Sequence, residues 1–343
     1  MEKKKKEIIF VSVAIAALAL VFFISISRSD TISNIIPDIL TPDDPTTLLF
    51  VGDIMLDRGV RNAINREGVD YPLGDIAELM RSVDVSVGNL EGVFTDNPSI
   101  SLVDNSILRF TFDPVLVSML KNYNFTGMSL ANNHAMDFGR AGFDNTKSLL
   151  SGRGIFSFGS PSNDLDISAR YKLEDEELCF VGYHSLYRED VSPVVNEINR
   201  IKETCNFVVV VVHWGEEYKD EENAAQRRQG RGFIDAGADL VIGHHPHVVQ
   251  PVEIYNGKAI FYSLGNFLFD QDFSLATRQS LAVRLTLSED SQEFHLIPLE
   301  MSRARVYYPE HEAYELRRSI LVSKLPDELK ASVTESGIFA LPR

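Results

Sequence analysis

From residue 47 onward, short apolar runs alternate with longer segments whose apolar residues recur at helical spacing. The apolar runs are predicted strands and occupy residues 48–51, 85–87, 125–130, 178–182, 207–212, 240–242 and 259–264. The predicted helices lie between these runs, at residues 75–82, 113–122, 139–151, 194–203 and 223–236. Continuous apolar strands that alternate with helices predict an α/β fold with a sheet covered on both faces.

Two later segments have a different pattern. Residues 281–287 and 293–299 alternate apolar and polar side chains with a period near two. This alternation is typical of strands with one buried face. We therefore predict a hairpin at the edge of the sheet.

The first 46 residues carry no such alternation. Residues 8–27 are free of charge and long enough to cross a bilayer as a helix. Lys3 to Lys6 precede them, which predicts a cytoplasmic N-terminus and an extracytoplasmic body. A cleaved signal peptide is the alternative, but S-I-S-R-S-D is a poor cleavage site. The expected organisation is a basic tip at 1–7, an anchor at 8–27, a linker at 28–46, a domain at 47–306 and a C-terminal tail of unknown role at 307–343.

The net charge of the chain indicates which classes of molecule it can bind. The net charge is −16, and residues 1–28 contribute +3, which leaves −19 on the rest of the chain. Nucleic-acid binding depends on basic patches, so an acidic body argues against a nucleic-acid partner. Acidity is also a common means of keeping a protein soluble.

The chain has two cysteines, Cys179 and Cys205. Both lie in or beside apolar runs, and we interpret them as small buried hydrophobic residues. A disulfide is permitted outside the cytoplasm, but the sequence does not show whether the two side chains meet.

Polar clusters follow six of the predicted strands. In chain order they contain Asp53, then Asn89 and Glu91, then Asn133, His134 and Asp137, then His213, then His244, His245 and His247, and finally Asn266. Ligands of open α/β sheets bind beyond the carboxyl ends of the strands, where parallel neighbours converge. The carboxylates, carboxamides and imidazoles of these clusters suit Mn, Fe or Zn, and they suffice for two ions. The alternative for any single histidine is a hydrogen-bonded structural role.

The same clusters, in this order, resemble the CapA family of capsule-biosynthesis proteins, which is associated with poly-γ-glutamate synthesis. The matching stretches lie between residues 48 and 271: F-V-G-D-I-M-L-D-R, V-G-N-L-E, S-L-A-N-N-H-A-M-D-F-G, V-V-V-V-H-W-G-E-E-Y, D-A-G-A-D-L-V-I-G-H-H-P-H-V-V-Q-P-V-E and I-F-Y-S-L-G-N-F-L-F-D-Q. That family is similar to the calcineurin-like metallophosphoesterases. The resemblance implies a four-layer α/β/β/α sandwich with two metals at the strand ends.

The resemblance also implies roles for particular residues. The implied metal ligands are Asp53, Glu91, Asn133, His213, His245 and His247, with Glu91 as the bridging carboxylate. His134 is the implied general acid. Two positions depart from the metallophosphoesterase pattern, because Met55 stands where a histidine is expected and Glu91 replaces an aspartate. Losing an imidazole would weaken or change one metal site.

Other polar or aromatic residues near the clusters have two interpretations each. We expect Asn89, Asp137, Trp214, His244 and Asn266 to support the ligands or contact substrate. For Trp214, a wall of the pocket and an anchor in the core are equally good interpretations. A carboxylate that orients a ligand histidine and a solvated surface group are both possible for Glu216.

Two functions fit these observations. The first is a metal-dependent hydrolase that acts on an anionic envelope polymer such as poly-γ-glutamate, with His134 protonating the leaving group. The second is a non-catalytic protein that binds the polymer through its metals during export. In either case the expected partners are the membrane, a membrane-bound synthase and the polymer.

Overall fold

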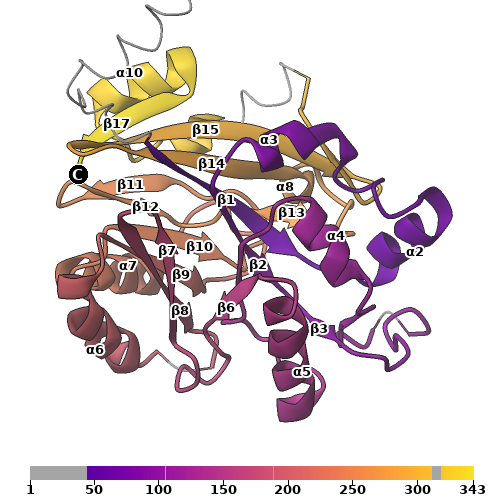
Figure 1. The fold of residues 1–343 in the computed structure, drawn as a ribbon. Helices are drawn as coiled ribbons and strands as arrows, with labels where there is room; N and C mark the ends of the chain where they lie inside the picture. The colour runs from indigo at the N-terminus through magenta and orange to yellow at the C-terminus, as the bar shows by residue number, and fades with distance from the viewer. Residues whose placement is uncertain (1–44, 105, 188, 311–317) are drawn as a thin grey trace, which may run out of the picture. The chain divides into compact units, whose positions relative to one another are not determined.

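The computed structural model describes residues 45–104, 106–187, 189–310 and 318–343. Strands and helices alternate through this part of the chain, which confirms the predicted mixed α/β class (Figure 1). The expected tip, anchor and most of the linker lie outside the described residues. None of the described helices combines the length and the apolar character that a bilayer crossing requires.

The larger sheet contains nine of the described strands. Their order is β16-β15-β14-β1-β2-β5-β6, with β13 also paired to β1 and β17 to β15. β1 runs parallel to β2, and β2 runs parallel to β5. The bounds are β1 Thr46–Ile54, β2 Val85–Leu90, β5 Gly127–Ser129, β6 Phe156–Phe158, β13 Asn266–Leu268, β14 Gln279–Leu287, β15 Ser291–Ser302, β16 Arg305–Tyr307 and β17 Ile338–Pro342.

The second sheet contains six described strands in the order β11-β12-β10-β9-β8-β7. Its central strands β8, β9, β10 and β12 are parallel. The bounds are β7 Ser168–Leu173, β8 Glu176–His184, β9 Phe207–His213, β10 Leu240–His244, β11 Val252–Tyr255 and β12 Lys258–Phe261. The apolar pattern predicted one sheet, whereas the strands divide between two.

The helices flank these sheets. All the predicted helices form, with ends shifted by up to three residues. In chain order, the first is η1 together with α3, the second is α4, the third is α5, the fourth is α6 together with η2, and the last is α7. The sequence pattern missed α2, whose buried residues are only Val60, Ala63 and Ile64. The bounds are α2 Arg58–Glu67, η1 Gly74–Ile76, α3 Ala77–Arg81, α4 Leu116–Asn122, α5 Gly139–Ser151, α6 Ser192–Ile201, η2 Lys202–Thr204, α7 Ala224–Ala236, α8 Leu275–Arg278 and α10 Asp327–Ser336; a small separate pair comprises β3 Val93–Phe94 and β4 Thr111–Phe112.

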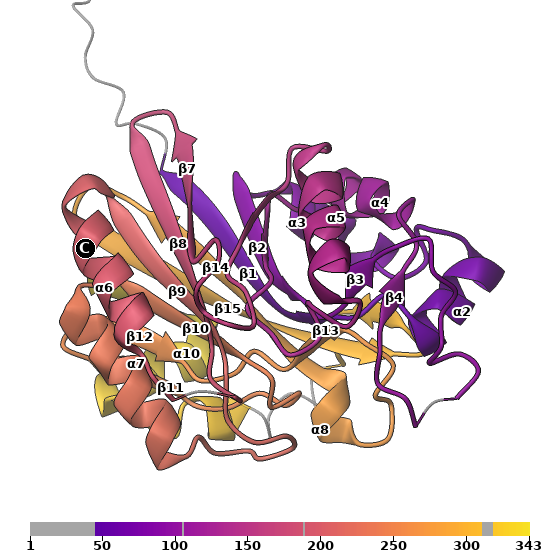
Figure 2. The same cartoon turned by 90° about the horizontal axis from the view of Figure 1, so that it is seen from below.

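Three apolar clusters separate four layers. In β1, Leu48 and Phe50 face the second sheet, while Leu49 and Val51 pack against α2 to α5. In the second sheet, alternate valines of β9 face either the first sheet or helices α6 and α7. Because strand side chains alternate between faces, each sheet is buried on both sides. Figure 2 shows the two sheets between their flanking helices.

The predicted hairpin forms from β14 and β15, but it is not at the edge of the sheet. β14 pairs with β1, and β15 pairs with both β16 and β17. The C-terminal tail supplies β17 and buries Leu325 and Val333 in the core between the sheets. The folded body therefore continues past the expected boundary at residue 306.

The sequence favoured two small buried hydrophobic residues and left a disulfide open, and the structure contains the disulfide. Cys179 in β8 and Cys205, just before β9, form a disulfide with a Cα–Cα distance of 6.0 Å. Leu178, next to Cys179, and Phe207, two residues after Cys205, are partners in the parallel register of the two strands. That pairing brings the cysteines together, although 26 residues separate them in the sequence.

Candidate metal centre

The candidate site forms where the carboxyl ends of strands from both sheets meet. Asp53 is in register with Asn89 in the first sheet, and His213 with His244 in the second. The imidazole Nδ1 of His244 lies 3.0 Å from Oδ1 of Asp53, so the two sheets are joined at this point. Gly52 permits the close approach of β1 to Gly265, since a Cβ at residue 52 would lie 2.0 Å from that carbonyl oxygen.

The first group of potential ligands comprises Asp53, Glu91 and His213. One ligand atom from each lies within 4.8 Å of the others, and all three side chains are buried. The amide nitrogen of Asn89 donates to Asp53 at 2.9 Å and to Glu91 at 3.0 Å. Asn133 Oδ1 lies 2.9 Å from Nε2 of His213, which places its amide beside the same group.

The second group comprises Glu217, His245 and His247. Asp53 connects it with the first group, because its Oδ2 accepts the backbone N–H of His245 at 3.2 Å and lies 3.4 Å from Nδ1 of His247. His245 and His247 have backbone φ angles of 95° and 58°. Such left-handed conformations are rare for residues other than glycine, and their strain tends to concentrate at functional sites.

The hydrogen bonds of Asn266 determine which nitrogen of His247 can bind a ligand. Its amide nitrogen donates to Gln271 Oε1 at 3.0 Å and to the Thr277 carbonyl at 3.1 Å. The amide oxygen therefore faces Nδ1 of His247, 2.9 Å away. An amide oxygen only accepts hydrogen bonds, so Nδ1 carries the proton and Nε2 is available as a ligand.

His134 occupies the wall of the adjoining cavity. Its Nδ1 lies 3.0 Å from Asp137, and its ring packs against Phe110 with centroids 4.2 Å apart. Asn132, which the sequence analysis did not assign to the site, accepts the backbone N–H of His134 at 3.0 Å. The carboxylate of Asp137 requires a proton on Nδ1, so Nε2 of His134 is the atom available for proton exchange.

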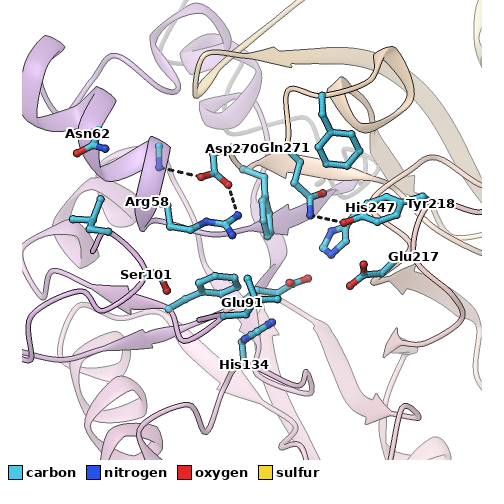
Figure 3. A pocket seen from close by; sticks show the side chains of 16 residues that line it. Arg58, Asn62, Glu91, Ser101, His134, Glu217, Tyr218, His247, Asp270 and Gln271 are labelled. Atoms are coloured by element: carbon cyan, nitrogen blue, oxygen red, sulfur yellow. Dashed lines mark hydrogen bonds and ion pairs between the residues drawn. The ribbon is translucent and has the colours of Figure 1, made fainter. Parts of the chain in front are cut away.

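The cavity has a volume of about 520 Å³. Figure 3 shows Arg58 on one side, Glu217 and His247 on the other, and Glu91 and His134 below them. Glu91 of the first ligand group, Glu217 and His247 of the second group, and His134 thus line one cavity.

The protonation of the site follows from burial and neighbouring charge. Burial alone would raise the pKa of Asp53, but hydrogen bonds and charge from His244 and His247 outweigh it and hold this pKa well below its usual range. Burial and the charge of Asp53 raise the pKa of Glu91. Burial and nearby imidazoles lower the pKa of His213 and bring that of His245 to about 3. These two histidines are therefore neutral at neutral pH, which is the form that binds metal.

These residues fit divalent metal ions. Asp53 and Glu91 are both buried, and among the described residues their ion-pair partners are histidines rather than Lys or Arg. Two buried carboxylates in contact with one amide are costly without a compensating cation. Mixed oxygen and imidazole donors are the ligands that Mn, Fe and Zn accept.

The structure decides between the two interpretations of Trp214 and of Glu216. Trp214 does not form a wall of the cavity: it is fully buried in the helix-side core of the second sheet, where its Nε1 donates to the Tyr262 carbonyl at 2.8 Å. Glu216 is exposed, whereas its neighbour Glu217, which the sequence analysis did not select, joins the second ligand group. The H-W-G-E-E stretch predicted a carboxylate near the site, but the sequence pattern could not decide whether Glu216 or Glu217 reaches it.

Met55, which stands where the metallophosphoesterase pattern has a histidine, does not point to a ligand position. Its side chain is buried in the core under helices α2 to α5, and its sulfur accepts the backbone N–H of Asp57 at 3.0 Å. A thioether is a soft ligand that hard divalent ions disfavour. Met55 therefore does not substitute for the missing imidazole.

Comparison with known proteins agrees with the motif pattern. Residues 47–271 match the family described as bacterial capsule synthesis protein PGA_cap. The PGA biosynthesis protein CapA of Bacillus subtilis is 32% identical, over 88% of this chain and 83% of its own length. The capsule biosynthesis protein CapA of Bacillus anthracis is 27% identical, over 87% and 77%. A solved phosphatase from Mycoplasma pneumoniae aligns with a TM-score of 0.42 at 14% identity, over 78% of this chain and 92% of that structure.

Proposed function

This chain belongs to the PGA_cap family of bacterial capsule synthesis proteins, and on that basis we propose that it is a metal-dependent hydrolase for an anionic capsule or envelope polymer such as poly-γ-glutamate. One observation carries the proposal. Two groups of potential metal ligands, linked through Asp53, open into a cavity that also contains His134. The four layers, with ligands at the strand ends, support a fold of the metallophosphoesterase type.

In this proposal, Asp53, Glu91 and His213 hold one divalent ion, and Glu217, His245 and His247 hold a second. Ions bound there would polarise the scissile group and activate a water molecule for attack. Asn89 orients the two buried carboxylates by donating to both, and Asn133 adds an amide oxygen beside His213.

His134 acts as the general acid. Asp137 holds the ring in place through its contact with Nδ1, while Phe110 packs against one face of the ring. Nε2 then delivers its proton to the leaving group in the cavity. A correctly placed acid of this kind contributes roughly 10²–10⁴-fold to the rate.

The proposed place of action is the outer side of the cell membrane, with residues 8–27 as the anchor. The disulfide between Cys179 and Cys205 supports this location, because disulfides persist in oxidising compartments. A membrane-bound polymer synthase is the proposed partner. The polymer would then meet the site as it leaves the membrane.

Met55 favours one alternative. Without the imidazole expected at this position, the first ion has fewer protein ligands, and the site could hold a polymer through its metals without cleaving it. This second function is binding during export.

Metal analysis of the purified full-length protein, followed by assays for phosphoesterase and γ-glutamyl hydrolase activity, tests the proposal. We expect up to two divalent ions per chain and metal-dependent turnover of one substrate class. A protein that contains neither Mn, Fe nor Zn after purification in their presence would contradict both functions. Full metal content without turnover of any substrate would favour the binding role.

A further inference from the structure

Arg58 is the only lysine or arginine that lines the cavity within the described part of the chain. It is the first residue of α2, and its side chain points toward the centre of the cavity (Figure 3). Its guanidinium lies over the ring of Phe110 at 4.9 Å and near that of Phe269 at 5.8 Å from the ring centroids. Its backbone φ of 49° is left-handed, which is unusual for a long side chain.

Among the described residues, one nitrogen of this guanidinium has a hydrogen-bond partner. Nη2 is paired with Asp270, whose second oxygen accepts the backbone N–H of Gly59 at 3.0 Å. Nε is buried and has no hydrogen-bond partner among the described residues. A guanidinium has five N–H donors in a planar fork that matches carboxylate and phosphate groups. Asp270 and the two rings therefore hold the group in place, while Nη1, which has no hydrogen-bond partner among the described residues and, unlike Nε, is not buried, remains available to a ligand.

Arg58 and the proposed acid share a wall of the cavity. The ring of Phe110 contacts both the guanidinium and the ring of His134. A substrate whose scissile group lies against the metal ligands and His134 therefore extends toward Arg58. The other charged groups of the cavity outside the histidines are carboxylates: Glu91, Glu217 and Asp270.

We propose that Arg58 binds an anionic substituent of the substrate next to the scissile bond, and that this contact makes the site specific for polymers with a regularly placed carboxylate or phosphate. The inference rests on the proposed function of the same cavity. It adds the chemical class of the group that the cavity recognises and the residue that recognises it.

Titration calorimetry of the full-length protein with γ-linked tetraglutamate and, separately, with inorganic phosphate tests the inference. Each titration is done with Mn²⁺ and again after treatment with a chelator, so that binding by metal and by Arg58 are measured apart. We expect Arg58→Gln to weaken binding about 10- to 100-fold under both conditions, the range given by hydrogen bonds to a charged group. If Arg58→Gln weakens the binding of tetraglutamate alone, the group that Arg58 recognises is a carboxylate. If it weakens the binding of phosphate alone, that group is a phosphoryl group.

Two further variants make the result specific. Arg58→Lys keeps a positive charge beside Asp270 but loses the planar fork, and we expect intermediate affinity. Arg66→Gln changes an exposed arginine of the same helix, whose one ion-pair partner among the described residues is Glu67, and should bind both probes as the wild type does. Melting temperatures within a few degrees of wild type show that the variants are folded.

The outcomes separate this inference from the proposed function. Equal affinity of wild type and Arg58→Gln, or no binding of either probe to the wild type, would overturn the inference. Metal content would then still support the proposed hydrolase. Binding that depends on Arg58 in a protein that retains no metal after purification in the presence of Mn, Fe and Zn would sustain the inference and reject the hydrolase.

Discussion

Individual side chains of the site are fixed by contacts that leave one nitrogen of each key histidine available. His247 is oriented by Asn266 and His134 by Asp137, in both cases through Nδ1. His244 differs, because its Nδ1 lies against Asp53 and the residue does not line the cavity. The three histidines thus have separable roles, which substitutions can distinguish.

We expect His245→Ala and His247→Ala each to reduce metal affinity by more than the 10- to 100-fold typical of a lost supporting residue. His244→Ala should fall within that range, because it removes a partner of Asp53 rather than a ligand. Metal per chain, measured by mass spectrometry after dialysis against dilute Mn²⁺, gives the comparison. Full metal content in both His245→Ala and His247→Ala would rule out the proposed centre.

His134→Ala should leave metal content unchanged and lower turnover by about 10²–10⁴-fold, since only the proton donor is removed. Asp137→Asn should lower turnover less, because the ring remains but loses the carboxylate that orients it through Nδ1. Steady-state rates on whichever substrate the panel identifies give the comparison. A parallel loss of metal and melting temperature in His134→Ala would indicate a structural histidine instead.

At the scale of elements, the parallel strands β8 and β9 carry different features at their two ends. The disulfide joins their entry side, where Cys179 lies early in β8 and Cys205 precedes β9. His184 and His213 end the same strands and are in register. Loss of the disulfide should therefore lower the stability of the fold and leave the metal centre intact.

Replacing both cysteines with alanine should lower the free energy of unfolding by about 3.5 kcal/mol, the magnitude expected for closing a loop between cysteines 26 residues apart. Urea unfolding of the double variant measures the change, and wild type under a reducing agent should show a similar decrease. Metal content is expected to stay at the wild-type value. If the variant is as stable as oxidised wild type, the cysteines do not pair in solution.

At the scale of the whole molecule, the folded body begins with β1 at Thr46 and closes with β17 at its C-terminal end. The tail contributes to the core between the sheets, so it belongs to the folded body and not to a separate appendage. The acidic body, with −19 beyond residue 28, repels a polyanion at long range. Under the proposed function, attraction of the polymer would have to come from metal ions and Arg58 inside the cavity.

A protein that comprises residues 46–343 should fold and remain soluble, because the paired strands and the three apolar clusters all lie within this range. Its melting temperature should match that of the full-length protein in detergent. A second truncation that ends at residue 306 should be clearly less stable, since it removes β17 and the buried residues of the tail. Insolubility of 46–343 beside a well-folded full chain would place the boundary elsewhere.

Protease added to intact cells should degrade the body and spare the N-terminus if residues 8–27 anchor the chain with its lysines inside. Immunoblotting with tags at either end reports both outcomes. A body that survives until the cells are lysed would contradict the proposed topology.

The sequence alone determined the alternation of strands and helices and the polar clusters that follow the strands. Both are local properties: an apolar run buries a strand wherever it lies, and Asp53 and His213 lie at the carboxyl ends of their own strands. The order of the clusters also sufficed to identify the family. These features needed no knowledge of which strands are neighbours.

Only the tertiary structure decided which residues meet across the two sheets. It brought Glu217 instead of Glu216 to the second ligand group, and it paired Cys179 with Cys205. It also turned Arg58, which belongs to a helix that the apolar pattern missed, into the cavity. Such contacts depend on sheet order and strand register, which are set by packing between segments far apart in the chain. Local spacing does not encode that packing.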